Sequence, residues 1–547
     1  VFPPWLLWSS KAEYILALMG YLVMPSGLLR FVTCWVHKGS WSFFIAYLLM
    51  LFGLGIPLLF LEMAVGQRAQ QSSIDLWKTL SPWFGGLGYS MVMVCLITNT
   101  YLNVFNSWIL FYMSHIFHFV VPWDRCPLQK NSSDFDPECE QATSYTYFWY
   151  RQTLKASDSI EDGGQPSFNL AMFLFLAWCL ICVFMVNGIK SLGKVLCVLL
   201  QVPYFIIICF LVRTLSMGNG IGYGLNYLLI LEVARISDLT MWCQAGIQVL
   251  FDIGLGFGPV ISLSSHMSDF NNCLKDAFLM GLFKIVTLLI TTPFFLSILG
   301  FWATITTHHC CKKSALLLDS GVSRKENGWQ TRRDHHGHQD KDFSASKCPS
   351  GHLPAVPWGH QCPQQKSIPT SKFMEGPGLA YVAFSQAITL FPGSSFWAII
   401  FFMSLVIMGL GTMTTLVEGI ALSLQKSIST LEKHPKLVPV IICLGGFLGS
   451  LVFSSRPGSY VVFLFDDHLV PMVLIMIVAF QNLSLAWVYG IKRFRAEMFG
   501  QLGRLVWAPF TFLWSYVTLP TLLVLLTIYF LNLYFSESLS YVSWNNS

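Results

Sequence analysis

Six ionisable side chains stand inside long apolar stretches of the sequence, where a charge is costly. They are Glu62, Asp252, Lys284, Glu418, Asp466 and Asp467. A charged group in the middle of a bilayer costs roughly 2.5–3.5 kcal/mol on insertion scales, so such groups are retained where they bind ions, pair with each other or line a solute pathway. Each of the six is therefore a candidate for one of those roles.

The composition places these groups in a membrane. Of the 547 residues, 54% are hydrophobic and 11% are charged, and the mean hydropathy is +0.58. A soluble domain averages about 25% charged residues. The chain is therefore predicted to be an integral membrane protein with lipid as one partner. Its net charge of +5 is spread over loops rather than gathered in one patch, which predicts no nucleic-acid partner.

Eleven apolar segments are long enough to cross a bilayer as helices, which predicts an all-α polytopic fold. They lie at residues 12–34, 42–66, 86–120, 168–187, 195–216, 240–266, 275–305, 394–424, 437–454, 459–489 and 506–534. Several connecting loops are basic, and the positive-inside rule puts those loops and the N-terminus in the cytoplasm. The membrane is expected to be the plasma membrane or that of an intracellular vesicle. The basic residues that set this orientation include Arg68, Lys78, Lys190, Lys194, Lys426, Lys433, Lys436, Lys492, Arg493, Arg495 and Arg504.

The acidic loop at residues 121–167 is expected on the opposite, extracellular side. It holds Cys126 and Cys139 on either side of the sequon Asn131-Ser132-Ser133. An oxidising compartment favours a disulfide between the two cysteines and N-glycosylation of Asn131. The alternative for the cysteines is a pair of free loop thiols.

Residues 307–372 have no helical periodicity and contain a Pro-, Gln- and Ser-rich run, which predicts a disordered extracellular insert. His335, His336 and His338 could bind zinc together with a neighbouring aspartate, although an insert without a ligand is the alternative. The predicted organisation is spans one to seven in residues 1–306, this insert, spans eight to eleven in residues 373–534, and a tail at residues 535–547.

Two of the predicted spans are interrupted in their middle. The first contains Met24-Pro25-Ser26-Gly27, and the sixth has three glycines and a proline between Gly254 and Pro259. Proline lacks an N–H and clashes with the preceding turn, while glycine relaxes the backbone. A helix broken at membrane depth persists where it is buried in protein or lines a wet cavity. The breaks therefore predict a binding site, against the alternative of two kinked helices without a ligand.

The residues around the first break also carry a family resemblance. Arg30-Phe31 follows the break, and the motif GIPLLFLEMAVGQ runs from Gly55 to Gln67. Together they resemble the first two spans of solute carrier 6, the sodium- and chloride-coupled neurotransmitter transporters, and in particular a divergent orphan member. The resemblance implies an inverted five-plus-five repeat of the LeuT-like kind, with the site at its broken first and sixth helices. It also implies a twelfth span, which this sequence is expected to lack. No nucleophile elbow, P-loop or metallohydrolase motif is present in a loop, so an enzyme is not predicted.

For the solute, the resemblance implies a pocket at the two breaks with an extracellular gate above it. Met24 stands where amine transporters carry an aspartate and amino-acid transporters a glycine, so it offers no counter-charge to an amine. Arg30 and Asp466 match the gate, a salt bridge that closes over the solute; an ordinary interfacial ion pair is the alternative. The other expected pocket residues, which could equally be packed core, are Tyr21, Thr98, Tyr101, Leu102, Phe251 and Phe257.

The second sodium site of the family corresponds to Gly20, Val23, Met408, Gly411 and Thr412. Backbone carbonyls survive any substitution and Thr412 keeps a hydroxyl, but Gly411 replaces an oxygen-bearing side chain. A hard cation needs several oxygen ligands. Weakened sodium binding is therefore predicted here, against the alternative of a glycine-rich helix contact.

The first sodium site and the chloride site depart further from the family. Asparagines are replaced by Gly27 and Lys284, serines are replaced by Asp252 and Leu288, and the retained residues are Tyr47 and Gln248. Lys284 brings a fixed positive charge to the place of sodium, and Asp252 brings a fixed negative charge near the place of chloride. If their side chains meet, a tethered ion pair replaces the mobile ions and coupling through this site is lost. Under the alternative, each charge faces a separate aqueous vestibule.

The cytoplasmic gate departs as well, since Trp5 replaces an arginine and Lys426 replaces its acidic partner, while Trp8 keeps the aromatic. The predicted function is a symporter-like secondary transporter of a small amino acid, amine or related solute, with weakened or altered coupling to sodium and with chloride coupling in doubt. The alternative is a non-transporting homologue that acts as a membrane partner or regulatory protein. No covalent cofactor and no particular oligomeric state are predicted.

Overall fold

The computed structural model describes residues 8, 10–38, 41–116, 121–128, 135–141, 144–186, 189–216, 233–268, 271–325, 378–389, 391–502 and 508–535. Within these ranges the regular structure is helical, and the only β-pairings are two isolated bridges, Leu128 with Phe135 and Pro166 with Ser455. Eight of the described helices are long and apolar enough to cross a membrane, and a bent pair raises the number to nine. The prediction of an all-α polytopic membrane protein is confirmed.

Each of the eleven predicted spans contains described helix. The first seven correspond to α1 (Lys11–Leu22) with α2 (Pro25–Lys38); α3 (Trp41–Met50), the π-helix η2 (Leu51–Gly55) and α4 (Ile56–Ala69); α6 (Gly85–Ile116); α9 (Phe168–Met185); α10 (Ile189–Ser216); α12 (Leu239–Ile253) with α13 (Pro259–Ser264); and α14 (Cys273–Lys325). Two of these fall short of the length and hydropathy needed on their own: α10, whose apolar part is Leu199–Thr214, and the divided α12 and α13.

The last four spans are built from α16 (Ser394–Ser427); α18 (Leu437–Ser450) with η7 (Leu451–Ser454); α19 (Gly458–Leu464), η8 (Phe465–Leu469), α20 (Val470–Leu483) and η9 (Ser484–Gly490), continued by α21 (Ile491–Leu502); and α22 (Ala508–Phe512), η10 (Leu513–Val517) and α23 (Thr518–Phe535). Short helices lie in the connections: α5 (Ser73–Leu80), η3 (Pro82–Phe84), α7 (Pro137–Gln141), α8 (Ser144–Tyr147), η4 (Phe148–Thr153), η5 (Val233–Ser237), α15 (Gly378–Thr389) and α17 (Ser429–Glu432).

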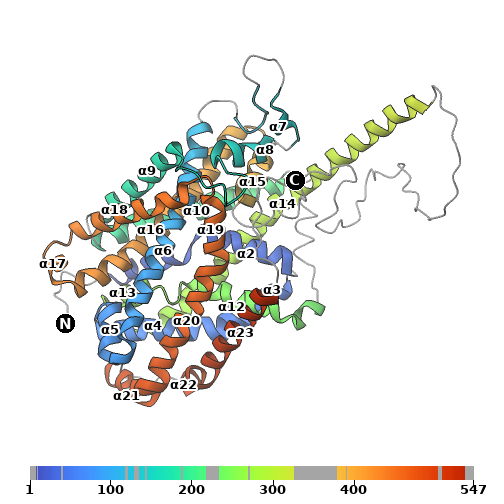
Figure 1. Cartoon of the computed structure of the whole chain (residues 1–547). Helices are drawn as coiled ribbons and strands as arrows, with labels where there is room; N and C mark the ends of the chain where they lie inside the picture. The colour runs from blue at the N-terminus through green and yellow to red at the C-terminus, as the bar shows by residue number, and fades with distance from the viewer. Residues whose placement is uncertain are drawn as a thin grey trace.

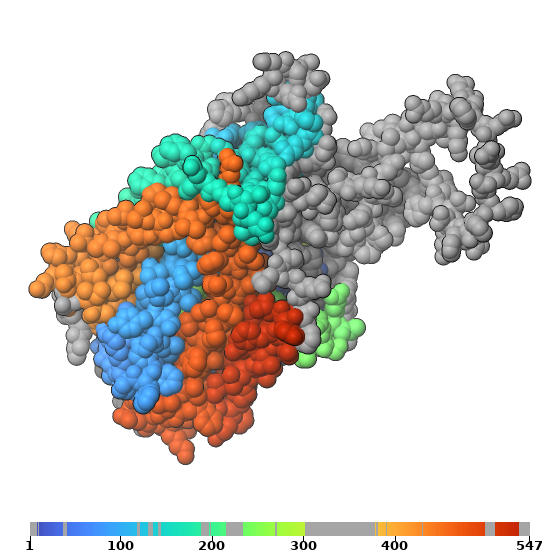
Figure 2. Space-filling model, in the orientation of Figure 1, coloured from blue at the N-terminus to red at the C-terminus, as the bar shows by residue number. Residues whose placement is uncertain are grey.

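The spans stack into one bundle in which early and late parts of the chain are interleaved (Figure 1). The helices of the acidic loop, α7 and α8, lie at one end of the bundle, and α5 and α21, which carry basic residues, lie at the other. In the space-filling view the blue surface of the early helices lies against the orange surface of the late ones (Figure 2). The long helices α6 and α16 pack so closely that a Cβ added at Gly409 would overlap the amide oxygen of Asn106.

The end of the seventh span differs from the prediction. The sequence placed this end at residue 305 and began a disordered insert at residue 307, but α14 continues as helix to Lys325 and projects beyond the bundle (Figure 1). Residues 306–320 contain no glycine or proline, so a helix already nucleated in the membrane can propagate through them. The rest of the predicted insert, including His335, His336 and His338, lies outside the described residues.

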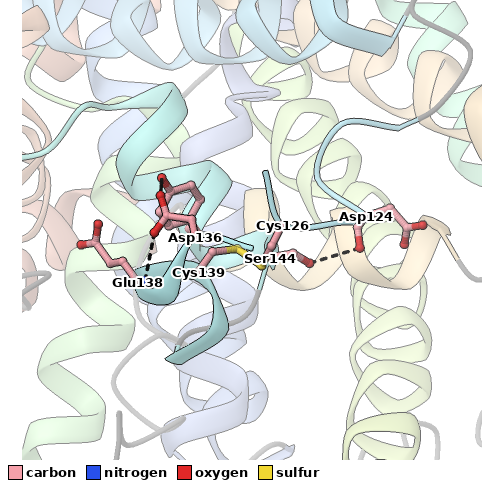
Figure 3. The surroundings of a disulfide bond; sticks show 7 residues. Asp124, Cys126, Asp136, Glu138, Cys139 and Ser144 are labelled. Carbon is pink, nitrogen blue, oxygen red and sulfur yellow. Dashed lines mark hydrogen bonds between the residues drawn. A yellow bond between two sulfur atoms is a disulfide. The ribbon is translucent and has the colours of Figure 1, made fainter. Parts of the chain in front are cut away.

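The acidic loop contains the predicted disulfide. Cys126 and Cys139 are bonded, with their Cα atoms 5.8 Å apart (Figure 3). Next to it the Asp136 carboxylate accepts hydrogen bonds from the Glu138 backbone N–H at 2.9 Å and from the Tyr147 hydroxyl at 3.0 Å. Burial and this hydrogen bond raise the pKa of Tyr147 to about 12. The sequon residue Asn131 lies outside the described residues.

Both interrupted spans break where the sequence predicts. α1 and α2 meet at an angle of 49° across Val23 and Met24. Between α12 and α13 the three glycines Gly254, Gly256 and Gly258 have φ values of +69°, +83° and +100°. L-amino acids with a side chain rarely adopt such values, so glycine is required to turn the chain here. The two breaks are also joined, because the Tyr21 hydroxyl donates to the Gly254 carbonyl at 2.7 Å.

Replacing Gly254 by alanine tests this junction. Besides its left-handed backbone, a Cβ at residue 254 would overlap the Tyr21 ring. We expect Gly254→Ala to lower the stability of the purified protein by at least about 1–3 kcal/mol, the cost of a strained backbone position, measured by thermal unfolding in detergent. Gly86→Ala is the matched control, since a Cβ there meets no atom within 4 Å. Equal melting temperatures for the two variants would contradict the prediction.

Candidate functional site

The first break and the sixth and seventh spans converge on a buried ion pair. The Lys284 ammonium on α14 lies 3.1 Å from Asp252 Oδ1 on α12, and neither side chain has exposed surface. The same ammonium donates to the Leu22 carbonyl at 3.1 Å, at the C-terminal end of α1. A cation there also complements the negative end of the helix dipole. The predicted meeting of the two charges is therefore observed, and the alternative of two separate vestibules is not.

The residues around this pair make further hydrogen bonds, one of them to the Asp252 carboxylate. The Tyr47 hydroxyl donates to Asp252 Oδ2 at 3.0 Å, and the Gln248 amide donates to the Gly27 carbonyl at 2.9 Å. A Cβ at residue 27 would lie 2.8 Å from Asp252 Oδ1, so glycine makes room for the carboxylate. Leu288 is buried and contributes no polar atom. All the residues expected at the altered ion site thus lie on four elements that surround the first break.

Oxygen atoms converge on a second point at the first break, as a cation site requires. The Thr412 hydroxyl on α16 lies 2.8 Å from the Val23 carbonyl, 3.2 Å from that of Met408 and 3.4 Å from that of Gly20. One hydroxyl carries one proton, so it satisfies only one of these three acceptors at a time. An all-oxygen set of this kind suits a hard cation such as Na⁺. A Cβ at Gly411 would meet only leucine side chains, at 3.9 Å, so the fold has room for the missing ligand.

The predicted gate residues are neighbours but do not pair through their charged groups. The Arg30 guanidinium donates to the backbone carbonyl of Asp466 at 2.9 Å and lies over the Phe251 ring, 5.5 Å from its centroid. The Asp466 carboxylate instead accepts a hydrogen bond from the Tyr101 hydroxyl at 3.1 Å. The expected side-chain salt bridge is therefore corrected: the arginine binds the main chain of Asp466, which lies in the π-helical turn η8.

A small cavity lies beside the first break, between α2, α6, α15 and α16. About 30 Å³ of it is open to a water-sized sphere, which is room for about two water molecules. It is lined by Met24, Pro25, Ser26, Leu29, Leu102, Phe105, Asn106, Ile109, Tyr381, Leu405, Gly409, Thr412 and Met413, none of which is charged.

The cavity contains only part of the predicted pocket. Of the expected residues, Met24 and Leu102 line it. Phe251 and Phe257 pack edge to face with their centroids 6.1 Å apart, and the other expected residues, Tyr21, Thr98 and Tyr101, are likewise buried outside the cavity wall. Sequence reasoning missed Ser26 and Asn106. The signal that could have found Asn106 is the series Asn99, Asn103 and Asn106, three amides on one face of an apolar span.

The cytoplasmic gate, on the opposite side of the breaks, is predicted to be lost. The structure describes two of its three positions, Trp8 and Lys426. The Trp8 indole donates to the Leu263 carbonyl at 3.1 Å, and the Lys426 ammonium donates to the Gln70 carbonyl at 2.5 Å. Trp5 lies outside the described residues. The nearby Lys11 on α1 forms an ion pair with Asp276 on α14 at 2.7 Å. Of the three remaining intramembrane carboxylates, those of Glu62 and Glu418 are buried and that of Asp467 is exposed. The Glu62 carboxylate accepts from the Gly256 N–H at 2.9 Å.

Comparison with known proteins shows which family the chain resembles over its length. The model of the sodium:neurotransmitter symporter family matches residues 6–546. The human orphan sodium- and chloride-dependent neurotransmitter transporter NTT5 is 41% identical over 99% of the chain and 74% of its own length. The mouse sodium-dependent neutral amino acid transporter B(0)AT2 is 33% identical over 98% of the chain and 74% of its own length. The human sodium- and chloride-dependent transporter XTRP3 is 32% identical over 99% and 90%.

Proposed function

The chain belongs to the sodium:neurotransmitter symporter family, and from this premise we propose that it transports a small neutral amino acid or related solute with ion coupling reduced to its second cation site. Members of the family are sodium-dependent transporters of small solutes rather than enzymes, and they are integral membrane proteins. The observation that carries the proposal is the buried pair of Lys284 and Asp252, 3.1 Å apart at the place of the first sodium ion.

The pair supports a loss of coupling because it occupies both the space and the charge of the mobile ions. Lys284 contacts the Leu22 carbonyl, a backbone oxygen released by the break. The two retained donors of the expected chloride site are also engaged, Tyr47 with Asp252 and Gln248 with Gly27. A sodium ion would meet a fixed ammonium and a chloride ion a fixed carboxylate. We infer that neither ion binds there and that transport is independent of chloride.

The second cation site supports a remaining, weak dependence on sodium. Its oxygens from Gly20, Val23, Met408 and Thr412 converge without any charged ligand. Gly411 contributes no side-chain oxygen, and fewer ligands with no carboxylate lower the affinity of a hard-cation site.

The solute class is inferred from the cavity and from the relatives. Met24 and the other lining residues offer no counter-charge to a cationic amine, and one relative is named a neutral amino acid transporter. The basic loops at the α5 and α21 end support a cytoplasmic N-terminus. We propose the plasma membrane or an intracellular vesicle membrane as its location.

A thermal-shift screen of the purified full-length protein in detergent tests the proposal. Neutral amino acids and amines are added in sodium or choline buffer, with chloride or gluconate as the anion. We expect a neutral amino acid to raise the melting temperature in every buffer, because a ligand that binds the native state stabilises it. Sodium should add a small further shift, and replacing chloride should change nothing.

The variant Thr412→Val should remove the sodium increment and keep the solute shift. Thr414→Val is the matched control, since the Thr414 hydroxyl bonds within α16 to the Leu410 carbonyl. A solute shift that required chloride, or one that disappeared in choline, would contradict the proposed coupling.

A non-transporting membrane partner is the second candidate. It is favoured by the Arg30 guanidinium, which binds the main chain of Asp466 instead of its carboxylate, and by Lys426, which stands where the family has an acidic gate residue. If no amino acid or amine stabilises the protein while a functional relative responds in the same screen, this second function replaces the first.

A further inference from the structure

The cavity beside the first break has two polar atoms that no described residue satisfies. One is the Ser26 hydroxyl, in the first turn of α2, which is buried and makes no hydrogen bond. The other is the side-chain oxygen of Asn106 on α6, a residue that is 3% exposed and whose only side-chain hydrogen bond to a described residue is made by its amide nitrogen. Both residues line the cavity. Buried polar groups without a partner are rare in native proteins and indicate a bound water or ligand.

The orientation of Asn106 is set by its neighbour on the same helix. Its amide nitrogen donates to the Asn103 side-chain oxygen at 3.0 Å. This hydrogen bond leaves the Asn106 oxygen as an acceptor, and it points toward Gly409 on α16, where the absence of a side chain makes room for it. The hydrogen bond within α6 thus fixes the direction of the Asn106 oxygen, and Gly409 on α16 leaves space for it. Ligand pockets combine a mostly apolar wall with a few polar groups whose positions are set by the protein in this way.

The wall of the cavity contrasts with these two atoms. Met24, Leu29, Leu102 and Met413 are apolar, and the lining contains no charged side chain. A solute part that enters here must therefore be uncharged, and it can both donate to Asn106 and exchange a hydrogen bond with Ser26. An apolar isostere would leave two buried polar atoms unpaired, and a site built for a hydrogen bond discriminates strongly against such an analogue.

We propose that Asn106 and Ser26 determine specificity, and that the solute carries an uncharged hydroxyl or carboxamide group which binds between them. The inference rests on the proposed transport of a neutral amino acid and narrows it to polar, uncharged side chains. In the present conformation the space holds about two water molecules.

Isosteric solute pairs test the inference on the purified full-length protein. Threonine and valine differ by a hydroxyl against a methyl, and asparagine and leucine differ by an amide against two methyls. We expect the polar member of each pair to raise the melting temperature at a concentration at least about tenfold lower than the apolar member, which corresponds to the lower part of the cost of leaving one buried polar atom unpaired. In the Asn106→Leu variant the preference for the polar member of each pair should disappear. In the Ser26→Ala variant the preference should weaken, and the preference for threonine over valine should weaken more than that for asparagine over leucine.

Asn482→Leu is the matched control, because Asn482 is equally buried but donates to Thr518 away from the cavity, at 2.7 Å. It should lower stability and keep the preference. If Asn106→Leu does not fold, Ser26→Ala decides the question, since it removes a single oxygen. Equal response of wild type to both members of each pair overturns the inference and leaves the proposed function in place. Response to no amino acid overturns both.

Discussion

Replacing Lys284 by methionine is expected to destabilise the protein by about 3–5 kcal/mol, and Asp252→Ser by a similar amount. Each substitution leaves the opposite charge buried without its partner, because both side chains are fully enclosed and only 3.1 Å apart. The stranded aspartate would keep the Tyr47 hydroxyl, and the stranded lysine would keep the Leu22 carbonyl, but neither neutral group balances the charge. Thermal unfolding in detergent and delivery to the cell surface measure the loss.

The double variant separates a lost ion pair from two independent packing defects. Lys284→Met combined with Asp252→Ser removes both charges, so its destabilisation should be clearly smaller than the sum of the single effects. Lys275→Met is the matched control, since Lys275 lies on the same helix with its side chain exposed. Additive losses, or single variants as stable as the Lys275 control, would show that the two charges do not depend on each other.

Restoring the family's residues at the altered ion site is expected to create sodium dependence. The variant Gly27→Asn, Asp252→Ser, Lys284→Asn exchanges the tethered pair for neutral oxygen ligands. The three changes must be made together, because a side chain at residue 27 would lie 2.8 Å from Asp252 Oδ1. Sodium at 100 times its Kd would then stabilise the variant by about 2.7 kcal/mol relative to choline, which is measured as a shift in melting temperature.

The second cation site must be silenced for this measurement, so the exchange is made in a Thr412→Val background. Thr412→Val alone should show no sodium shift, and wild type should show only the small shift from its second cation site. Gly27→Asn alone should be destabilised without gaining any response to sodium, since the carboxylate still occupies the space. A folded triple variant that is indifferent to sodium would mean that the Lys284 and Asp252 pair is not what prevents sodium binding.

Much of this architecture could be predicted from the sequence because its causes are local. Proline and glycine break helices wherever they stand, so Pro25 and the glycines from Gly254 to Gly258 mark the two interruptions without reference to anything distant. Hydropathy over about 20 residues identifies a membrane span, and a charged residue within such a span is recognised from the sequence alone. The same local reasoning failed at the end of α14, because helix propagation past residue 306 depends on the preceding turns more than on composition.

The contacts between distant helices were decided only by the tertiary structure. The resemblance matched Arg30 and Asp466 to the two residues of a gate. It could not show that the Arg30 guanidinium binds the backbone carbonyl of Asp466, which lies 436 positions away in a π-helical turn, rather than the carboxylate. The resemblance also placed Phe251 and Phe257 in the pocket, but neither lines the cavity beside the first break. Its lining includes the expected Met24 and Leu102 and the unexpected Ser26, Asn106 and Gly409.

The sequence alone was therefore enough to identify the residues that are unusual for a membrane, which are the charges and the helix breaks. The tertiary structure decided which of them touch, as with Lys284 and Asp252. The reason is geometric. A hydrogen bond or ion pair requires two atoms within about 3 Å, and that separation is set by how helices cross and which rotamers fit between them.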